Sequence, residues 1–189
     1  MEAREYILGL MAIISGLAIS DMVQSLHGLL ERARRVRWAW APLATAAFVL
    51  VTIVYSWWAA WEADLVPISL WAFLLLLGQQ IALFLAAKAA LPDPAPGDHP
   101  VGGLDLGAWY AGSSRYIYVA LLVCMVLVHL LAAVRMEPGA WRGWAVERTP
   151  AAVAIAALAL WRWRPLHLVL PPLLIVVTLW RFGGVMLGD

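Results

Sequence analysis

Residues 6–37 read YILGLMAIISGLAISDMVQSLHGLLERARRVR, an apolar run that ends in a block of arginines. A helix needs about 20 mostly apolar residues to cross the hydrocarbon core of a bilayer, and this run supplies them before its first arginine. The run also carries Asp21, Gln24 and His27. The stretch therefore predicts a membrane-spanning helix that has one polar face.

The composition of the whole chain supports a membrane protein. Of its 189 residues, 64% are apolar and 13% are charged, which leaves too little polar surface to cover a soluble domain. The single cysteine, Cys124, excludes an intrachain disulfide and a cysteine metal cluster. We expect an all-α, polytopic membrane helical bundle that forms a single domain over residues 1–189.

Apolar segments of spanning length occur about six times, although the fifth has a short apolar core. All twelve tryptophans fall at or near a predicted segment end, as expected for rings at the membrane interface. The connection 90–114 is rich in proline and glycine, so its first half is not helical, and Asp105 is expected to cap a short interfacial helix within it. The predicted spans are 6–29, 39–61, 66–89, 115–135, 146–162 and 165–184.

The distribution of basic residues predicts the orientation. Eight arginine and lysine residues fall on one side of the predicted membrane and five on the other, so the positive-inside rule places both termini in the periplasm. The twelve arginines against one lysine suggest a GC-rich bacterial genome, and hence a bacterial inner membrane. A block this short sets topology and meets anionic lipid head groups rather than nucleic acid. It consists of Arg32, Arg34, Arg35 and Arg37.

Polar side chains inside the spans are the candidate functional residues, because a central charge costs about 2.5–3.5 kcal/mol on insertion scales. Counted by depth, Asp21 lies near two glutamines of the third segment, and a histidine of the fourth lies near a polar face of the second. They predict a path on which Asp21 and His129 exchange protons while the other groups hold water or an ion. The alternative is interhelical hydrogen bonding worth about 0.6–2 kcal/mol per pair. The residues are Asp21, Gln24, Gln79, Gln80, Thr52, Tyr55 and His129.

Motifs for catalysis or cofactor binding do not stand out. The chain has no Gly-rich phosphate loop, H-E-x-x-H or nucleophile elbow, so we expect no catalytic residues and no metal site, and an enzyme is disfavoured. A bis-histidine haem needs two histidines at one depth, and only His27 and His167 qualify. Both are expected at the interface, so haem is not predicted. The 90–114 loop is either a lid or docking loop with four possible ligands or a solvated connector, and the lack of metal-ligand spacing favours the connector. The four residues are Asp93, Asp98, His99 and Asp105.

Two further patterns concern the second segment and its neighbours. The sequence WAWAPL at 38–43 is echoed by WRWRPL at 161–166, which fits either an internal repeat or convergent use of interface residues. The stretches EYILGLMAIISGLAISDMVQSLHGLLERARRVRWAWAPL, YSWW and LDLGAWYAGSSRYIY resemble a family of small uncharacterised bacterial multi-pass integral membrane proteins. The resemblance covers the first two-thirds of the chain and implies a topology but no activity.

Three functions remain open at this point. The first is a channel or transporter for protons, ions or a small solute, which uses the polar path. The second is a non-catalytic membrane subunit or scaffold that positions a protein partner, and the third is a haem- or quinone-binding redox subunit. Besides the lipid bilayer, we expect a homo-oligomer or a membrane complex, because Asp21 and the two glutamines would suit a subunit interface.

Overall fold

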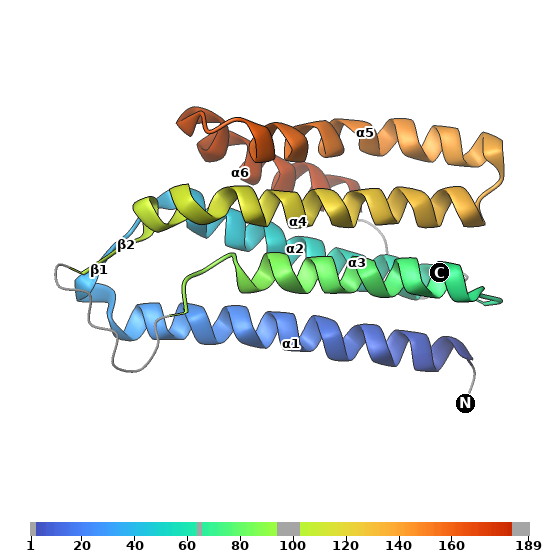
Figure 1. Ribbon diagram of the computed structural model, residues 1–189, viewed down its shortest axis with the longest axis horizontal. Coiled ribbons are helices and arrows are strands. Elements are labelled where there is room, and N and C mark those ends of the chain that lie inside the picture. The colour runs from blue at the N-terminus through green and yellow to red at the C-terminus, as the bar shows by residue number, and fades with distance from the viewer. Residues whose placement is uncertain (1–2, 64–65, 94–102, 183–189) are drawn as a thin grey trace.

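Six helices make up the protein in the computed structural model, which describes residues 3–63, 66–93 and 103–182 (Figure 1). The predicted all-α bundle is confirmed. Short elements join the helices at one end of the bundle: a 3-10 helix at Ala33–Arg35 and the strands β1 (Val36–Arg37) and β2 (Leu104–Asp105). The helices are α1 (Ala3–Glu31), α2 (Trp40–Glu62), α3 (Leu70–Lys88), α4 (Leu106–Arg135), α5 (Pro138–Leu160) and α6 (Arg164–Phe182).

The helices form two layers. In the front layer α1, α3, α4 and α5 lie side by side in that order, and α2 and α6 lie behind them, packed against each other (Figure 1). Successive helices run in alternating directions, so α2, α4 and α6 all begin at the same end of the bundle. We call this end the basic end, because it carries Arg32, Arg34, Arg35, Arg37, Arg162 and Arg164.

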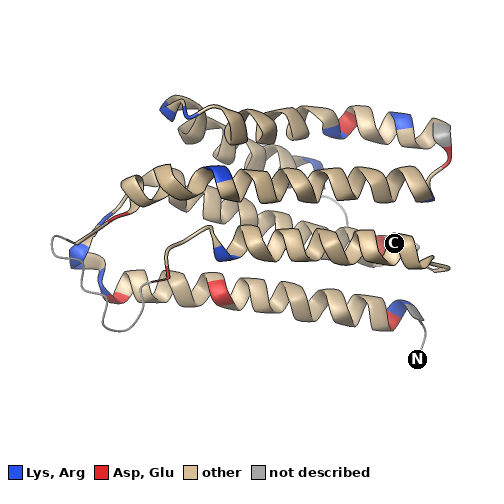
Figure 2. Cartoon of the chain, in the orientation of Figure 1, with Lys and Arg blue, Asp and Glu red and all other residues tan. Residues whose placement is uncertain are grey.

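Four of the described helices, α1 to α4, are long and apolar enough to cross a membrane, which identifies a membrane protein. Long stretches of these helices carry no charge, and most charged residues lie toward the two ends of the bundle (Figure 2). The fifth helix begins at Pro138 rather than at 146 as predicted, because a proline is well suited to the first turn, where its missing N–H leaves no hydrogen bond unmade.

The beginning of α4 corrects one expectation. Asp105 does act as a cap, since its carboxylate accepts a hydrogen bond of 2.9 Å from the Ala108 N–H. The predicted short interfacial helix, however, is not separate from the fourth span: α4 runs without a break from Leu106 to Arg135. The reason is that no proline interrupts the sequence after the cap, and Gly112 and Ser113 are tolerated inside a helix that the rest of the bundle supports.

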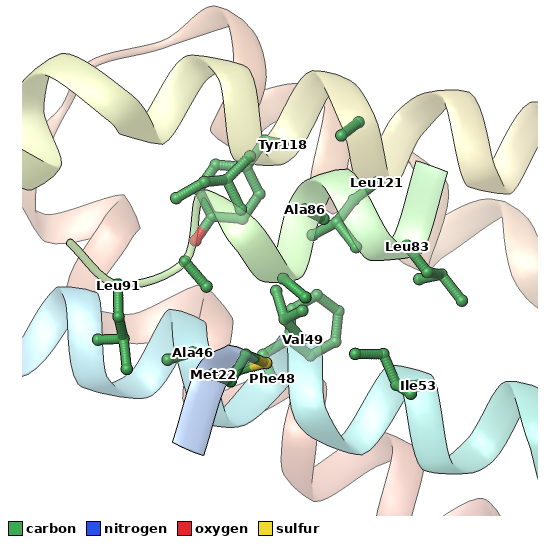
Figure 3. Packing of buried hydrophobic residues seen from close by; sticks show 14 of the residues in the cluster. Met22, Ala46, Phe48, Val49, Ile53, Leu83, Ala86, Leu91, Tyr118 and Leu121 are labelled. Carbon is green, nitrogen blue, oxygen red and sulfur yellow. The ribbon is translucent and has the colours of Figure 1, made fainter. Parts of the chain in front are cut away.

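An apolar core fills the space between the layers. Figure 3 shows Phe48, Val49 and Ile53 of α2 facing Leu83 and Ala86 of α3 and Leu121 of α4. At the basic end, β1 pairs in parallel with β2, so that Val36 lies opposite Leu104 and Arg37 opposite Asp105. This pairing joins the α1–α2 connection to the start of α4 and thereby fixes the rim of the site described next.

Candidate functional site

A pocket of about 610 Å³ opens at the basic end of the bundle. Its wall is formed by the N-terminal parts of α2, α4 and α6, by Arg162 before α6, and by Arg37 of β1 and Asp105 of β2. Three arginines line it, namely Arg37, Arg162 and Arg164, while Asp105 is the single acidic residue among the described residues of its wall. The volume lies within the range of about 300–1,000 Å³ that is typical of small-molecule sites.

Asp105 is held in place from two sides. The Arg37 guanidinium lies 3.2 Å from one carboxylate oxygen, and the Ala108 N–H donates to the other. The hydrogen bond from Ala108, followed by the nearby Arg37 charge, lowers the pKa of Asp105 below its ordinary value. The carboxylate is therefore ionised at neutral pH and keeps Arg37 at the rim of the pocket.

A buried hydrogen-bond network lies beneath the pocket. The Tyr110 hydroxyl is 3.0 Å from the Thr45 hydroxyl and 3.0 Å from the Tyr118 hydroxyl, and Thr45 and Tyr118 are 2.8 Å apart. His167 extends the network, because its Nδ1 is 2.9 Å from the Tyr110 hydroxyl. We call Thr45, Tyr110, Tyr118 and His167 the Tyr–His network. Tyr110 and His167 also line the pocket, so the network is in direct contact with it.

Hydrogen bonding orients the His167 ring. Its Nε2 is 2.9 Å from the Trp161 carbonyl oxygen, which can only accept, so Nε2 donates and carries the proton. In the neutral ring Nδ1 then accepts from Tyr110. Thr45 and Tyr118 are fully buried and Tyr110 and His167 are 6% exposed, yet each polar group has a partner, as buried polar groups require.

A second polar layer lies deeper in the bundle. Gln79 and Gln80 both donate to the Ser56 hydroxyl, over 2.9 Å and 3.1 Å, and the Ser15 hydroxyl is 3.5 Å from the Gln80 side-chain oxygen. All four side chains are buried, and they connect α1, α2 and α3. We call Ser15, Ser56, Gln79 and Gln80 the Gln–Ser layer.

The predicted partners of the two glutamines lie elsewhere. Asp21 forms an ion pair of 2.6 Å with Lys88, the last residue of α3, and Lys88 is also 3.5 Å from Asp93. Gln24 is exposed and donates to Ser20 on its own helix over 3.1 Å. The structure thus brings Gln79 and Gln80 together with two serines and gives Asp21 a basic partner.

The outer residues of the predicted path also bond to different partners and do not form one cluster. Thr52 donates to the Phe48 carbonyl of its own helix over 2.8 Å, and His129 Nδ1 is 2.7 Å from the Met125 carbonyl oxygen. The His129 ring also contacts the ring of Trp144 on α5, with centroids 5.1 Å apart. The Arg148 guanidinium lies over the Trp144 ring, 4.2 Å from its centroid, and donates a hydrogen bond of 3.3 Å to the Tyr55 hydroxyl. Trp144 and Arg148 of α5 thus connect His129 with Tyr55.

The remaining predicted positions have simple surroundings. His27 is exposed and lies 3.3 Å from Glu31, whereas His167 is buried with both ring nitrogens hydrogen-bonded, so the two do not form a pair. Arg34, Arg35 and Arg37 are exposed at the basic end. Within residues 3–63, 66–93 and 103–182, no group of three or more histidine, cysteine or acidic residues is placed to hold a metal ion. Asp98 and His99 lie outside the described residues.

The sequence analysis did not predict the Tyr–His network or the role of Arg162 and Arg164 in the wall of the pocket. The repeated W-x-W-x-P-L sequence carried a usable signal, because it begins the two helices that pack together at the pocket. In each copy a polar residue follows the proline within one turn, Thr45 after Pro42 and His167 after Pro165. Comparison with protein-family models, with curated proteins and with solved structures finds no match for this chain.

Proposed function

We propose that this chain is a small bacterial inner-membrane transporter that moves a solute or ion between the pocket at its basic end and the opposite side of the membrane. In this proposal the basic end faces the cytoplasm and both termini face the periplasm, as the positive-inside rule indicates. The observation that carries the proposal is a pair of buried polar layers, stacked along membrane-spanning helices, of which one contacts a pocket.

The separation of the layers supports a gated route. Thr45 and Ser56 are both on α2, and a rise of about 1.5 Å per residue puts them roughly 16 Å apart along the helix. Phe48, Val49 and Ile53 are buried between them and belong to the apolar core of Figure 3. A solute that left the Tyr–His network would therefore meet a closed apolar layer before it reached the Gln–Ser layer, as in one state of an alternating-access cycle.

A flux assay tests this proposal. The purified chain is reconstituted into liposomes, and fluxes of protons, potassium, inorganic phosphate and glycerol 3-phosphate are followed separately. Gln80→Leu removes a buried amide from the Gln–Ser layer, while Gln24→Leu makes the same change on an exposed helix face. We expect at least one flux to be lost in Gln80→Leu and retained in Gln24→Leu. Equal flux in the two variants, or no flux of any of the four, would overturn the proposal.

The second candidate function is a non-catalytic membrane subunit that positions a protein partner. It is favoured by one specific observation: both layers contain hydrogen bonds between side chains of different helices, such as Thr45 to Tyr118 and Gln79 to Ser56, so the layers also serve to hold the bundle together. This candidate predicts no flux in the liposome assay, together with a defined partner that is retained during mild purification.

Self-association remains a proposal with a narrower basis. Gln79 and Gln80 are buried within one chain, so they do not need a subunit interface. The Asp21 side chain is 25% exposed and the Lys88 side chain 47% exposed, so this ion pair is the polar surface that association would cover. Molecular mass in detergent, compared between the wild type and Asp21→Asn, tests this arrangement.

A further inference from the structure

We infer that the pocket at the basic end binds a phosphate-bearing anion, either a free phosphate compound or the phosphate of a lipid head group. The charge of the wall is the first support. Among the described residues of the wall three arginines face one aspartate, so these four side chains together contribute a net charge of +2. Arginine is the residue best suited to phosphate, since its planar guanidinium donates two parallel hydrogen bonds to phosphate oxygens.

Two of these arginines have no acidic partner in the described part of the chain. Asp105 pairs with Arg37, but no ion pair or hydrogen bond of Arg162 or Arg164 to another described residue is found. Arg162 lies in the connection between α5 and α6, and Arg164 is the first residue of α6. Within the described part of the chain, their positive charges are therefore not compensated where they line the pocket.

The helix ends at the pocket add backbone donors. The first N–H groups of a helix lack intrahelical partners and favour an anion. Ser69 caps α3 and Asp105 caps α4 through their side chains, whereas Ala39 at the start of α2 provides no capping side chain. Ala39, Trp40 and Ala41 line the pocket, so the uncapped end of α2 faces the proposed anion.

A hydroxyl in the wall supplies a further donor. Ser114 is only 5% exposed and lines the pocket, yet its hydroxyl has no hydrogen-bond partner among the described residues. The hydroxyl is not among the fully buried side-chain atoms that lack a partner, so it is open to the pocket and can donate to a ligand there. The hydroxyl, the uncapped helix end and the arginines thus supply donors to one space.

The size and remaining wall of the pocket indicate an organic phosphate rather than a bare ion. About 610 Å³ accommodates a small molecule, and the part of the wall without charge is formed mainly by alanines with Pro42 and Leu168. If the proposed transport holds, this compound is the transported solute, and in that respect the inference rests on the proposed function. The binding itself does not depend on transport.

Binding to the purified full-length chain in detergent tests the inference. The probes are inorganic phosphate, glycerol 3-phosphate and dioctanoyl phosphatidic acid, each titrated by calorimetry. The pocket variant is Arg162→Gln/Arg164→Gln. The matched control is Arg34→Gln/Arg35→Gln, which removes the same charge from exposed arginines at the same end but outside the pocket wall. Because all four side chains are exposed, elution volume on size exclusion suffices to verify the fold.

We expect at least one phosphate probe to bind to the wild type. Its dissociation constant should rise at least about tenfold in the pocket variant and stay within about twofold of the wild-type value in the control. Binding of the two soluble phosphates identifies a free compound as the source, and binding of phosphatidic acid alone identifies a lipid head group. Failure of all three probes, or an equal loss in the control, would overturn the inference.

Flux and binding fail independently. Pocket-dependent binding without any flux in liposomes would remove the transport proposal and keep the phosphate site. Flux that depends on Gln80, without pocket-dependent binding of any phosphate probe, would keep transport and remove the site.

Discussion

The Lys88 ammonium lies 2.6 Å from a carboxylate oxygen of Asp21 and so connects the end of α3 to α1. Two charges in membrane-spanning helices thereby compensate each other, which removes much of the cost of placing either one there alone. The second oxygen of Asp21 is buried without a partner in the described chain. The pair gives Asp21 a structural role that is distinct from the proton exchange predicted for it.

A double-mutant cycle separates these two roles. We expect Asp21→Asn and Lys88→Gln each to lower the free energy of unfolding in detergent, because each removes the 2.6 Å ion pair and Lys88 is left with only the longer contact to Asp93. The double variant should recover part of the loss, with a coupling energy of about 1 kcal/mol for this partly exposed pair. Strictly additive losses would show that the pair contributes nothing to stability.

Flux in the same variants addresses the proton hypothesis. If Asp21 exchanges protons, Asp21→Asn abolishes proton flux in liposomes, and the added Lys88→Gln does not restore it. Restoration of flux in the double variant would assign Asp21 to pairing alone and remove it from the path.

The Tyr–His network gives a prediction about stability with a control on the same helix. Tyr118 is fully buried and its hydroxyl contacts Thr45 and Tyr110, whereas Tyr116 is 52% exposed. Tyr118→Phe should cost about 1 kcal/mol of unfolding free energy, since Thr45 and Tyr110 still bond to each other when the hydroxyl is lost. Tyr116→Phe should change it by less than about 0.5 kcal/mol. Chemical unfolding in detergent measures both, and equal effects would contradict a role of the network in stability.

Helix positions were predictable from the sequence because the membrane imposes a length and an apolar composition on each span. The segment 39–61 became α2 at Trp40–Glu62, and Ser69 starts α3 as its N-cap. Gln79 and Gln80 were expected level with Asp21, but they bond to Ser56 while Asp21 pairs with Lys88 near the end of α3, so depth could be predicted only approximately. The direction of each side chain could not be predicted, because it depends on which helices become neighbours.

His129 and Thr52 illustrate this limit. Both bond to carbonyls one turn earlier on their own helices, an option open to any such side chain inside a helix, and it competes with an interhelical path. The pocket was missed for a related reason. Arg37 and Arg164 are separated by more than half of the chain, and only the packing of α2 against α6 and the pairing of β1 with β2 bring them to one wall.

Asp105 predicts a dependence of stability on pH. Because its pKa in the folded chain lies below the ordinary value of 3.8, the carboxylate stabilises the fold above about that pH and this contribution disappears as the pH falls through the lower folded pKa. Asp105→Asn retains an oxygen that can cap α4 but loses the charge. We expect melting temperatures of the wild type and the variant to converge between about pH 4 and about pH 2. A constant difference across this range would exclude the Asp105 charge as its source.

Gly103 predicts the strongest local effect at the rim of the pocket. Its φ of 84° is unfavourable for other residues, and a Cβ atom there would lie 2.5 Å from the Arg35 carbonyl oxygen. Gly103→Ala should therefore disturb the pairing of β1 with β2, lower stability by about 1–2 kcal/mol and weaken phosphate binding by shifting Arg37. The matched control is Gly112→Ala in α4, where nothing lies within 4 Å and alanine is the better helix former, so stability should rise by about 0.5–1 kcal/mol. Phosphate binding that is unchanged in Gly103→Ala, despite a measured loss of stability, would separate the rim from the site and leave Arg162 and Arg164 as its anion-binding residues.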